Sequence, residues 1–158
     1  MIQRIQSLYL LLAAIMTVVV VFIPIGYIYT DEASLVFTSF VLKEDIPNGA
    51  IKMQTLYIAI ILFVSAATSI YTLFNYKNRR KQTKINNFNM ILLFVVLVLM
   101  LYVFPDVLFS REGYILNPEE FKFNYWIMMG VLPPFFIFLA NRAIKKDENL
   151  VRSADRLR

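Results

Sequence analysis

The side chains in this sequence that could bind a metal ion are two adjacent carboxylate pairs, Asp31-Glu32 and Glu119-Glu120. Hard cations take carboxylate oxygens as ligands, but they need several of them in one place. Neither pair is accompanied by a cluster of further ligands, and each lies in a polar stretch between apolar segments. We therefore expect solvated surface charges here and no metal site.

The 158 residues include no histidine and no cysteine. The lack of cysteine excludes disulfides, thiolate catalysis and zinc–thiolate sites. The lack of histidine removes the commonest general base and the commonest metal ligand. We expect no catalytic residue, no cofactor-binding residue and no metal ligand, so that the protein is not an enzyme.

Four apolar blocks dominate the chain, at about residues 5–23, 55–75, 88–104 and 123–141. Each has about the length that crosses a bilayer, roughly 20 residues. All 27 charged residues lie outside these blocks. The first block is longer than the core of a typical signal peptide and is not followed by a small-x-small site, so we expect it to be an uncleaved helix. The pattern predicts one all-α membrane domain, a bundle of four transmembrane helices.

Basic residues are distributed unevenly between the connecting segments. The loop 76–87 and the tail 142–158 are rich in them, whereas the loops 24–54 and 105–122 carry more acidic than basic residues. The positive-inside rule then places both termini and the loop 76–87 in the cytoplasm, and the two acidic loops outside. The basic residues of the cytoplasmic loop are Lys77, Arg79, Arg80, Lys81 and Lys84.

The long outer loop contains a β-branched and aromatic stretch, residues 34–42, that predicts a strand. Residues 27–30 are a candidate second strand, residues 113–116 a candidate edge strand, and residues 47–49 a tight turn. Together they predict a small antiparallel sheet of two or three strands. The sheet is either a docking surface for a periplasmic partner, through Leu35, Phe37 and Phe40, or a cap over the helix ends.

The fourth block contains Pro133 and Pro134, which predict a kink or break in that helix. In some transporters such a break lines a substrate site, but here the neighbouring side chains are apolar, so we expect a structural kink. On the second block, Ser65, Thr68 and Ser69 form a patch of small residues that predicts a helix–helix contact. No ionisable side chain lies inside the blocks, which opposes a pump or an ion-coupled carrier.

The tail 142–158 has no proline or glycine and predicts a cytoplasmic helix with a narrow apolar face. This helix either lies at anionic lipid headgroups or docks a cytoplasmic partner. In the second case we expect contacts from Leu150, Val151, Arg152, Arg156 and Arg158. Contact of the basic loop with RNA or a ribosome is not expected, since the positive-inside rule already accounts for its charge.

The two ends of the chain, residues 1–14 (MIQRIQSLYLLLAA) and 145–158 (KKDENLVRSADRLR), resemble an uncharacterised family of short four-helix inner-membrane proteins of Bacteroidota. The resemblance implies a bacterial inner-membrane protein and supplies no catalytic residue. The four-helix plan with a long first outer loop is also similar in shape to the claudins, but their outer cysteine pair is absent.

Two functions follow as hypotheses. The first is a non-enzymatic accessory subunit of a larger bacterial inner-membrane complex, with a protein-export or secretion assembly as one candidate and with the bilayer and other membrane subunits as partners. It rests on elimination, because the chain has distinctive ends but no catalytic set. The alternative is a small channel or carrier for an apolar or lipid-like substrate, hinged at the two prolines.

Overall fold

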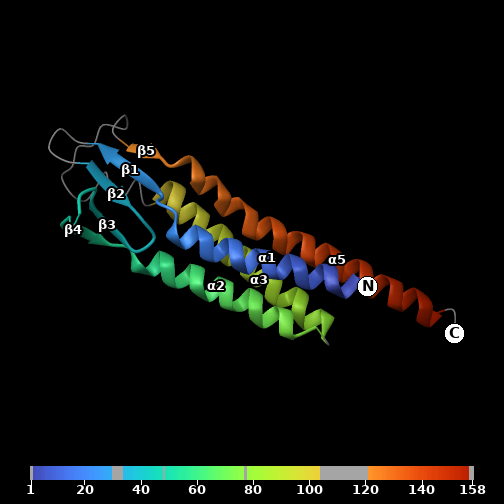
Figure 1. Cartoon of the computed structure of the whole chain (residues 1–158). Helices are drawn as coiled ribbons and strands as arrows, with labels where there is room; N and C mark the ends of the chain where they lie inside the picture. The colour runs from blue at the N-terminus through green and yellow to red at the C-terminus, as the bar shows by residue number, and fades with distance from the viewer. Residues whose placement is uncertain (1, 30–33, 48, 77, 104–120, 157–158) are drawn as a thin grey trace.

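The computed structural model describes residues 2–29, 34–47, 49–76, 78–103 and 121–156. Its helices are α1 (Ile2–Phe22), α2 (Leu56–Phe74), α3 (Arg79–Val98) and α5 (Leu132–Arg156). A π-helix, η1 (Leu99–Val103), continues α3, and a 3-10 helix, η2 (Tyr125–Val131), precedes α5. The four long helices lie side by side, with a small sheet at one end of the bundle (Figure 1).

The helices form a closed ring in which α1 packs on α2 and α5, and α3 packs on the same two helices. Buried alanines of α1 and α2, such as Ala13 and Ala59, let the helices approach closely. Leu62, Val96 and Ile137 are among the side chains that fill the space between them.

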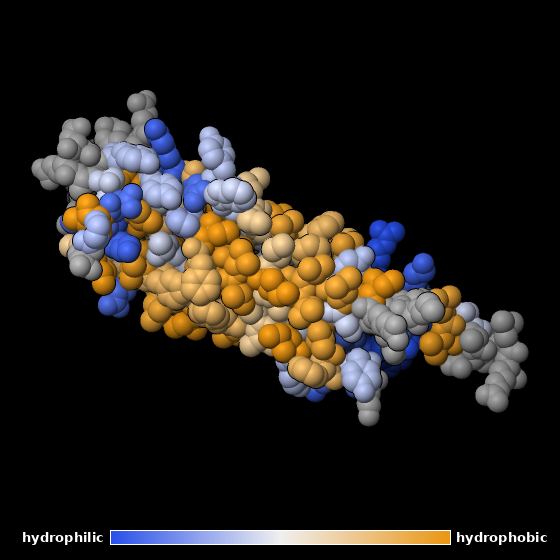
Figure 2. Space-filling view, in the orientation of Figure 1, coloured by the Kyte–Doolittle hydropathy of each residue, from blue (hydrophilic) through white to orange (hydrophobic). Residues whose placement is uncertain are grey.

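Large apolar side chains also cover the outside of the bundle, as the wide orange surface in Figure 2 shows. Leu8, Ile60, Phe94 and Phe138 are examples, one from each helix. An exposed apolar surface of this extent is unusual for a soluble protein. Four helices in the described ranges are long and apolar enough to cross a membrane, which indicates a membrane protein.

The sheet has five antiparallel strands in the order β4-β3-β2-β1-β5. They are β1 (Gly26–Tyr29), β2 (Ser34–Phe37), β3 (Val41–Glu44), β4 (Ile51–Gln54) and β5 (Phe121–Phe123). The expected strand at 27–30 is confirmed by β1, whereas the expected strand at 113–116 and part of the 47–49 turn lie outside the described residues. The sheet is therefore larger than the two or three strands expected.

The expected single strand at 34–42 is wrong, because the chain turns back between β2 and β3. The Thr38 hydroxyl accepts hydrogen bonds from the backbone amides of Phe40 and Val41, and the Thr38 amide donates to the Val41 carbonyl at 3.0 Å. This local hydroxyl–backbone bonding stabilises a turn inside a stretch of strand-forming residues.

The sheet packs on the helix ends and closes one end of the bundle. Its inner side chains Ile28, Leu35 and Phe37 join the same buried cluster as Val21 of α1 and Ile58 of α2. A backbone hydrogen bond also joins the sheet to α2. The amide of Thr55, the residue directly before α2, donates to the Phe40 carbonyl at 2.9 Å. The arrangement is that of a cap over the helix ends.

The third and fourth helices differ from their expected bounds. α3 begins at Arg79, so most of the expected loop 76–87 is helix; Asn78 caps it by accepting from the Lys81 amide at 3.1 Å. Residues 142–156, expected as a separate tail helix, continue the fourth helix without a break as the end of α5.

Pro133 and Pro134 lie in the first turn of α5, directly after the 3-10 helix η2. Amides in the first turn of an α-helix have no partner within the helix, so proline is tolerated there. The chain therefore changes from 3-10 to α-helix at the prolines, instead of kinking within a continuous α-helix as expected.

Candidate functional site: the basic end of the bundle

Basic side chains gather at the end of the bundle opposite the sheet, which we call the basic end. α3 starts there and α5 ends there, so residues 68 positions apart in the sequence, such as Arg79 and Asp147, meet (Figure 1). In Figure 2 hydrophilic side chains, in blue, lie at both ends of the apolar surface, at this end and at the sheet. The basic residues there whose side chains the structure describes are Arg79, Arg80, Lys81, Lys84, Arg142, Lys145 and Lys146.

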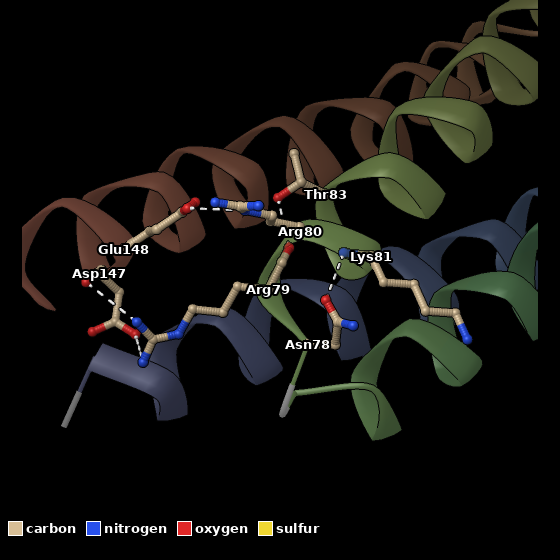
Figure 3. A network of polar contacts seen from close by, with 7 residues as sticks. All are labelled: Asn78, Arg79, Arg80, Lys81, Thr83, Asp147 and Glu148. Atoms are coloured by element: carbon tan, nitrogen blue, oxygen red, sulfur yellow. Dashed lines mark hydrogen bonds and ion pairs between the residues drawn. The ribbon is translucent and has the colours of Figure 1, made fainter. Parts of the chain in front are cut away.

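Two ion pairs join α3 to α5 at the basic end (Figure 3). Arg79 Nη2 lies 2.8 Å from Asp147 Oδ2, and these side chains are only 25% and 14% exposed. Arg79 Nη1 also donates to the Asp147 carbonyl at 3.4 Å. The second pair, Arg80 with Glu148, is longer at 3.9 Å and its arginine is 81% exposed. The first pair is therefore the shorter and more buried of the two contacts between α3 and α5.

Next to the ion pairs, α3 directs three amide side chains into the bundle, which we call the polar seam: Gln82, Asn86 and Asn89. All three are buried. Their spacing of four and three residues places them on one face of the helix. Sequence reasoning missed Gln82 and Asn86, which it assigned to a solvated loop; the signal was their helical spacing with Asn89.

Hydrogen bonds connect the polar seam to both neighbouring helices. Asn89 accepts from the Ser65 hydroxyl at 2.6 Å and donates to the Ser69 hydroxyl at 2.8 Å. Asn86 donates to the Asn141 side chain at 2.9 Å, and Gln82 donates to the Thr72 carbonyl at 3.2 Å. Because these groups are neutral amides and hydroxyls, their evident role is to fix how the helices pack.

The expected helix–helix contact at the small-residue patch is confirmed for Ser65 and Ser69, through these bonds to Asn89. The Thr68 hydroxyl instead bonds the Val64 carbonyl of its own helix.

Replacing Asn89 with leucine should lower the free energy of unfolding by about 1 to 2 kcal/mol. It removes the two bonds to the serine hydroxyls and a third, in which Asn89 donates to the Ser65 carbonyl at 3.2 Å. The loss stays small because the freed serine hydroxyls can bond carbonyls of their own helix. Reversible denaturation in mild detergent measures it. Thr68→Val is the matched control, because it removes a hydroxyl that bonds only within α2. It should change stability by less than about 0.5 kcal/mol. An unchanged stability in Asn89→Leu would show that the polar seam does not hold the helices.

The expected partner-binding residues of the first outer loop are mostly inside the protein. Leu35 is buried and Phe37 is 0% exposed, both within the cluster between sheet and helices. Phe40 is half-buried, and its ring lies 6.0 Å from that of Phe22. A side chain buried in the core cannot contact a partner, so Leu35 and Phe37 are core residues here and not a docking surface.

The expected partner-binding residues of the tail are differently placed. Leu150 and Val151 are exposed on α5, at 49% and 44%. Arg152 and Arg156 lie within the helical range of α5, and Arg158 lies outside the described residues.

The basic residues expected in the cytoplasmic loop divide into three groups. Arg79 and Arg80 form the ion pairs with α5. Lys81 donates to the Tyr71 hydroxyl at 3.3 Å, and Lys84 is exposed. Lys77 lies outside the described residues.

Two grooves flank Arg142 on α5. The first, of about 290 Å³, lies between α3 and α5 and is lined by Asn87, Met90, Phe138, Asn141, Arg142 and Lys145. The second, of about 230 Å³, lies between α1 and α5 and is lined by Ile5, Tyr9, Leu139, Arg142, Ala143 and Lys146. Each combines basic and apolar side chains. Sequence reasoning did not find them, because they are formed by the packing of distant helices.

The described part of the chain holds no group of three or more acidic side chains that could bind a metal ion. Asp31, Glu32, Glu119 and Glu120, the carboxylates considered for such a site, lie outside it. The chemistry that the basic end offers is binding: paired and unpaired cations, amide donors and apolar walls.

A family model described as "Domain of unknown function (DUF4293)" matches residues 2–157. The chain belongs to this family. The match confirms the resemblance to an uncharacterised family that the two ends of the sequence indicated. A search of curated proteins finds no match to the chain. The family carries no assigned activity, so function has to be argued from the geometry.

Proposed function

We propose that this DUF4293 protein is a non-enzymatic accessory subunit of a larger bacterial inner-membrane complex, with a protein-export or secretion assembly as the first candidate. In this proposal both termini and the basic end lie in the cytoplasm, and the sheet faces the periplasm. The concentration of basic residues at one end of the bundle supports this orientation.

The observation that carries the proposal is the length and course of α5. The helix has 25 residues, roughly 37 Å at 1.5 Å per residue, which exceeds a hydrocarbon core of about 30 Å. It continues past the start of α1 along the direction of the bundle (Figure 1). Its last part therefore projects from the bundle and does not turn to lie along a membrane surface.

In this proposed orientation Leu150 and Val151 lie beyond the lipid headgroups. Arg142 is the first charged residue after the apolar part of α5, and Leu150 follows it by eight residues, about 12 Å along the helix. The headgroup layer is roughly 5 to 8 Å thick on each side of the hydrocarbon core. Two adjacent exposed apolar side chains in water, on a helix anchored by the Arg79–Asp147 ion pair, favour a docking helix over a lipid-bound one.

The test uses single cysteines, since the chain has none of its own. A cysteine at Leu150 should be labelled by a membrane-impermeant maleimide only after permeabilisation, and one at Tyr29 of β1 in intact cells. In mild detergent the wild-type chain should copurify with a different membrane protein that crosslinks to the Leu150 cysteine. Leu150→Glu should reduce this copurification about tenfold, as expected when a charge enters an apolar contact.

Asn149→Glu is the matched control, because it adds the same charge at the neighbouring exposed position. It should leave copurification within twofold of wild type. Recovery of the wild-type chain only as a monomer or homo-oligomer would contradict the accessory role. Labelling of the Leu150 cysteine in intact cells would contradict the orientation.

The alternative, a carrier hinged at the prolines, gains no support from the packing beside them. A Cβ atom at Gly130 would lie 2.9 Å from Leu97 Cδ2 of α3, so α3 is already in close contact there. Pro133 is buried, and so are Ile127 and Ile137 on either side. A substrate path would need space at this point, and close packing opposes it.

A further inference from the structure

We propose that the groove between α3 and α5 at the basic end binds the headgroup of an anionic phospholipid, with Arg142 and Lys145 holding the phosphate and Met90 and Phe138 contacting an acyl chain. The inference requires that the bundle lies in a membrane. It does not depend on the accessory role, because lipid binding is measured on the purified chain alone.

The groove is polar at one end and apolar at the other, in the order that a lipid requires. α3 runs away from the basic end, so Asn87 lies nearer that end than Met90. α5 runs toward it, so Phe138 lies on the bilayer side of Arg142 and Lys145. From Phe138 to Lys145 the helix rises about 10 Å, the scale of a headgroup and the first part of a chain.

The two cations of the groove are available to a ligand. Within the described part of the chain, neither Arg142 nor Lys145 forms an ion pair, whereas Arg79 and Arg80 on the adjacent helix are paired with acidic residues of α5. Arg142 and Lys145 are three residues apart, so they lie on the same face of α5. Both are exposed, and a guanidinium and an ammonium together suit a phosphate group.

The polar seam fixes the amide wall of the groove. Asn141 is 7% exposed; it accepts from Asn86 at 2.9 Å and donates to the Asn87 side-chain oxygen at 2.8 Å. The Asn87 side-chain oxygen thus faces the protein, while its side-chain NH2 group donates to no described residue. An oriented amide donor beside two cations adds a hydrogen bond for a phosphate or ester oxygen.

Volume and surroundings favour a membrane lipid over a soluble anion. The groove, of about 290 Å³, is several times larger than the roughly 30 Å³ that one water molecule takes in the liquid, so it has room for a polar group of several heavy atoms. Its apolar wall continues onto the outer surface of the bundle, where Phe94 and Phe138 are exposed. Basic pockets between transmembrane helices are known to bind anionic headgroups. The groove between α1 and α5 has the same two cation types but no asparagine among its lining residues.

The test is native mass spectrometry of the purified full chain in neutral detergent, titrated with phosphatidylglycerol or with zwitterionic phosphatidylcholine. Phosphatidylglycerol should bind at least tenfold more tightly. Arg142→Gln with Lys145→Gln should weaken its binding about thirtyfold, and Lys145→Gln alone about fivefold, from the usual contribution of a basic residue at an anionic surface.

Lys146→Gln is the matched control, because it removes the same charge one residue along but lines the other groove. It should change binding in the α3–α5 groove by less than twofold. Thermal unfolding of each variant shows that it is folded, and the exposed Lys145 gives a single variant that leaves the packing intact.

Three outcomes would overturn the proposal. Equal binding of the two lipids would show that charge is not recognised. An effect of Lys146→Gln as large as that of Lys145→Gln would show attraction by the whole basic end and no site in this groove. Displacement of phosphatidylglycerol by millimolar inorganic phosphate would assign the groove to a soluble anion.

Discussion

Phe37→Ala should lower the free energy of unfolding by about 3 to 5 kcal/mol, the usual loss when a buried phenylalanine is truncated. Phe37 is 0% exposed and lies where the sheet meets the helices, among Val21, Ile25 and Ile28. Truncation removes this apolar contact and leaves a cavity that the sheet and the helix ends cannot fill together. Reversible denaturation in mild detergent measures the change.

Two further variants make this prediction specific. Tyr29→Ala, at an exposed position of the adjacent strand β1, should change stability by less than about 1 kcal/mol. Phe40→Ala should fall between the two, because Phe40 is half-buried against Phe22. If Phe37→Ala kept full stability and instead lost a partner in copurification, the sheet would be a docking surface after all.

The helices could be predicted from the sequence wherever their outer face is apolar, because an uncharged apolar block of about 20 residues is typical of a membrane span. The start of α3 could not. Gln82 and Asn86 are polar, so hydropathy predicts that the helix begins only near residue 88. The helix begins earlier because the hydrogen-bond partners of these two side chains lie on α2 and α5. Hydropathy reports contact with lipid, whereas these side chains are satisfied inside the protein.

The sheet shows the same limit for non-local contacts. Strand-forming composition located β1 and the region of β2 and β3, but not the turn at Thr38, which the Thr38 hydroxyl and a local backbone bond stabilise. β5 pairs with β1 across more than 90 residues of chain, and three residues carry too little local pattern to indicate that pairing. The groove between α3 and α5 likewise requires these helices to be packed before Asn87 and Lys145 line the same space.

Asp147→Ala should lower the free energy of unfolding by about 2 kcal/mol, because it leaves Arg79 without its carboxylate at the α3–α5 contact. Breaking a fully buried pair costs about 3 to 5 kcal/mol, and the 25% exposure of Arg79 reduces this through solvent screening. The variant should also release the projecting end of α5, so that copurification through Leu150 falls together with stability.

The charge-swapped double variant, Arg79→Asp with Asp147→Arg, separates the ion pair from simple packing. If the 2.8 Å pair is what holds α5 to α3, the swap should restore more than half of the stability that Asp147→Ala loses. Glu148→Ala is the control, since its partner Arg80 is 81% exposed and 3.9 Å away, and it should change stability by less than about 0.5 kcal/mol. Equal losses from Asp147→Ala and Glu148→Ala would mean that α5 is held by the polar seam and its apolar packing. The projecting helix would then owe its direction to the bundle core and not to the ion pair.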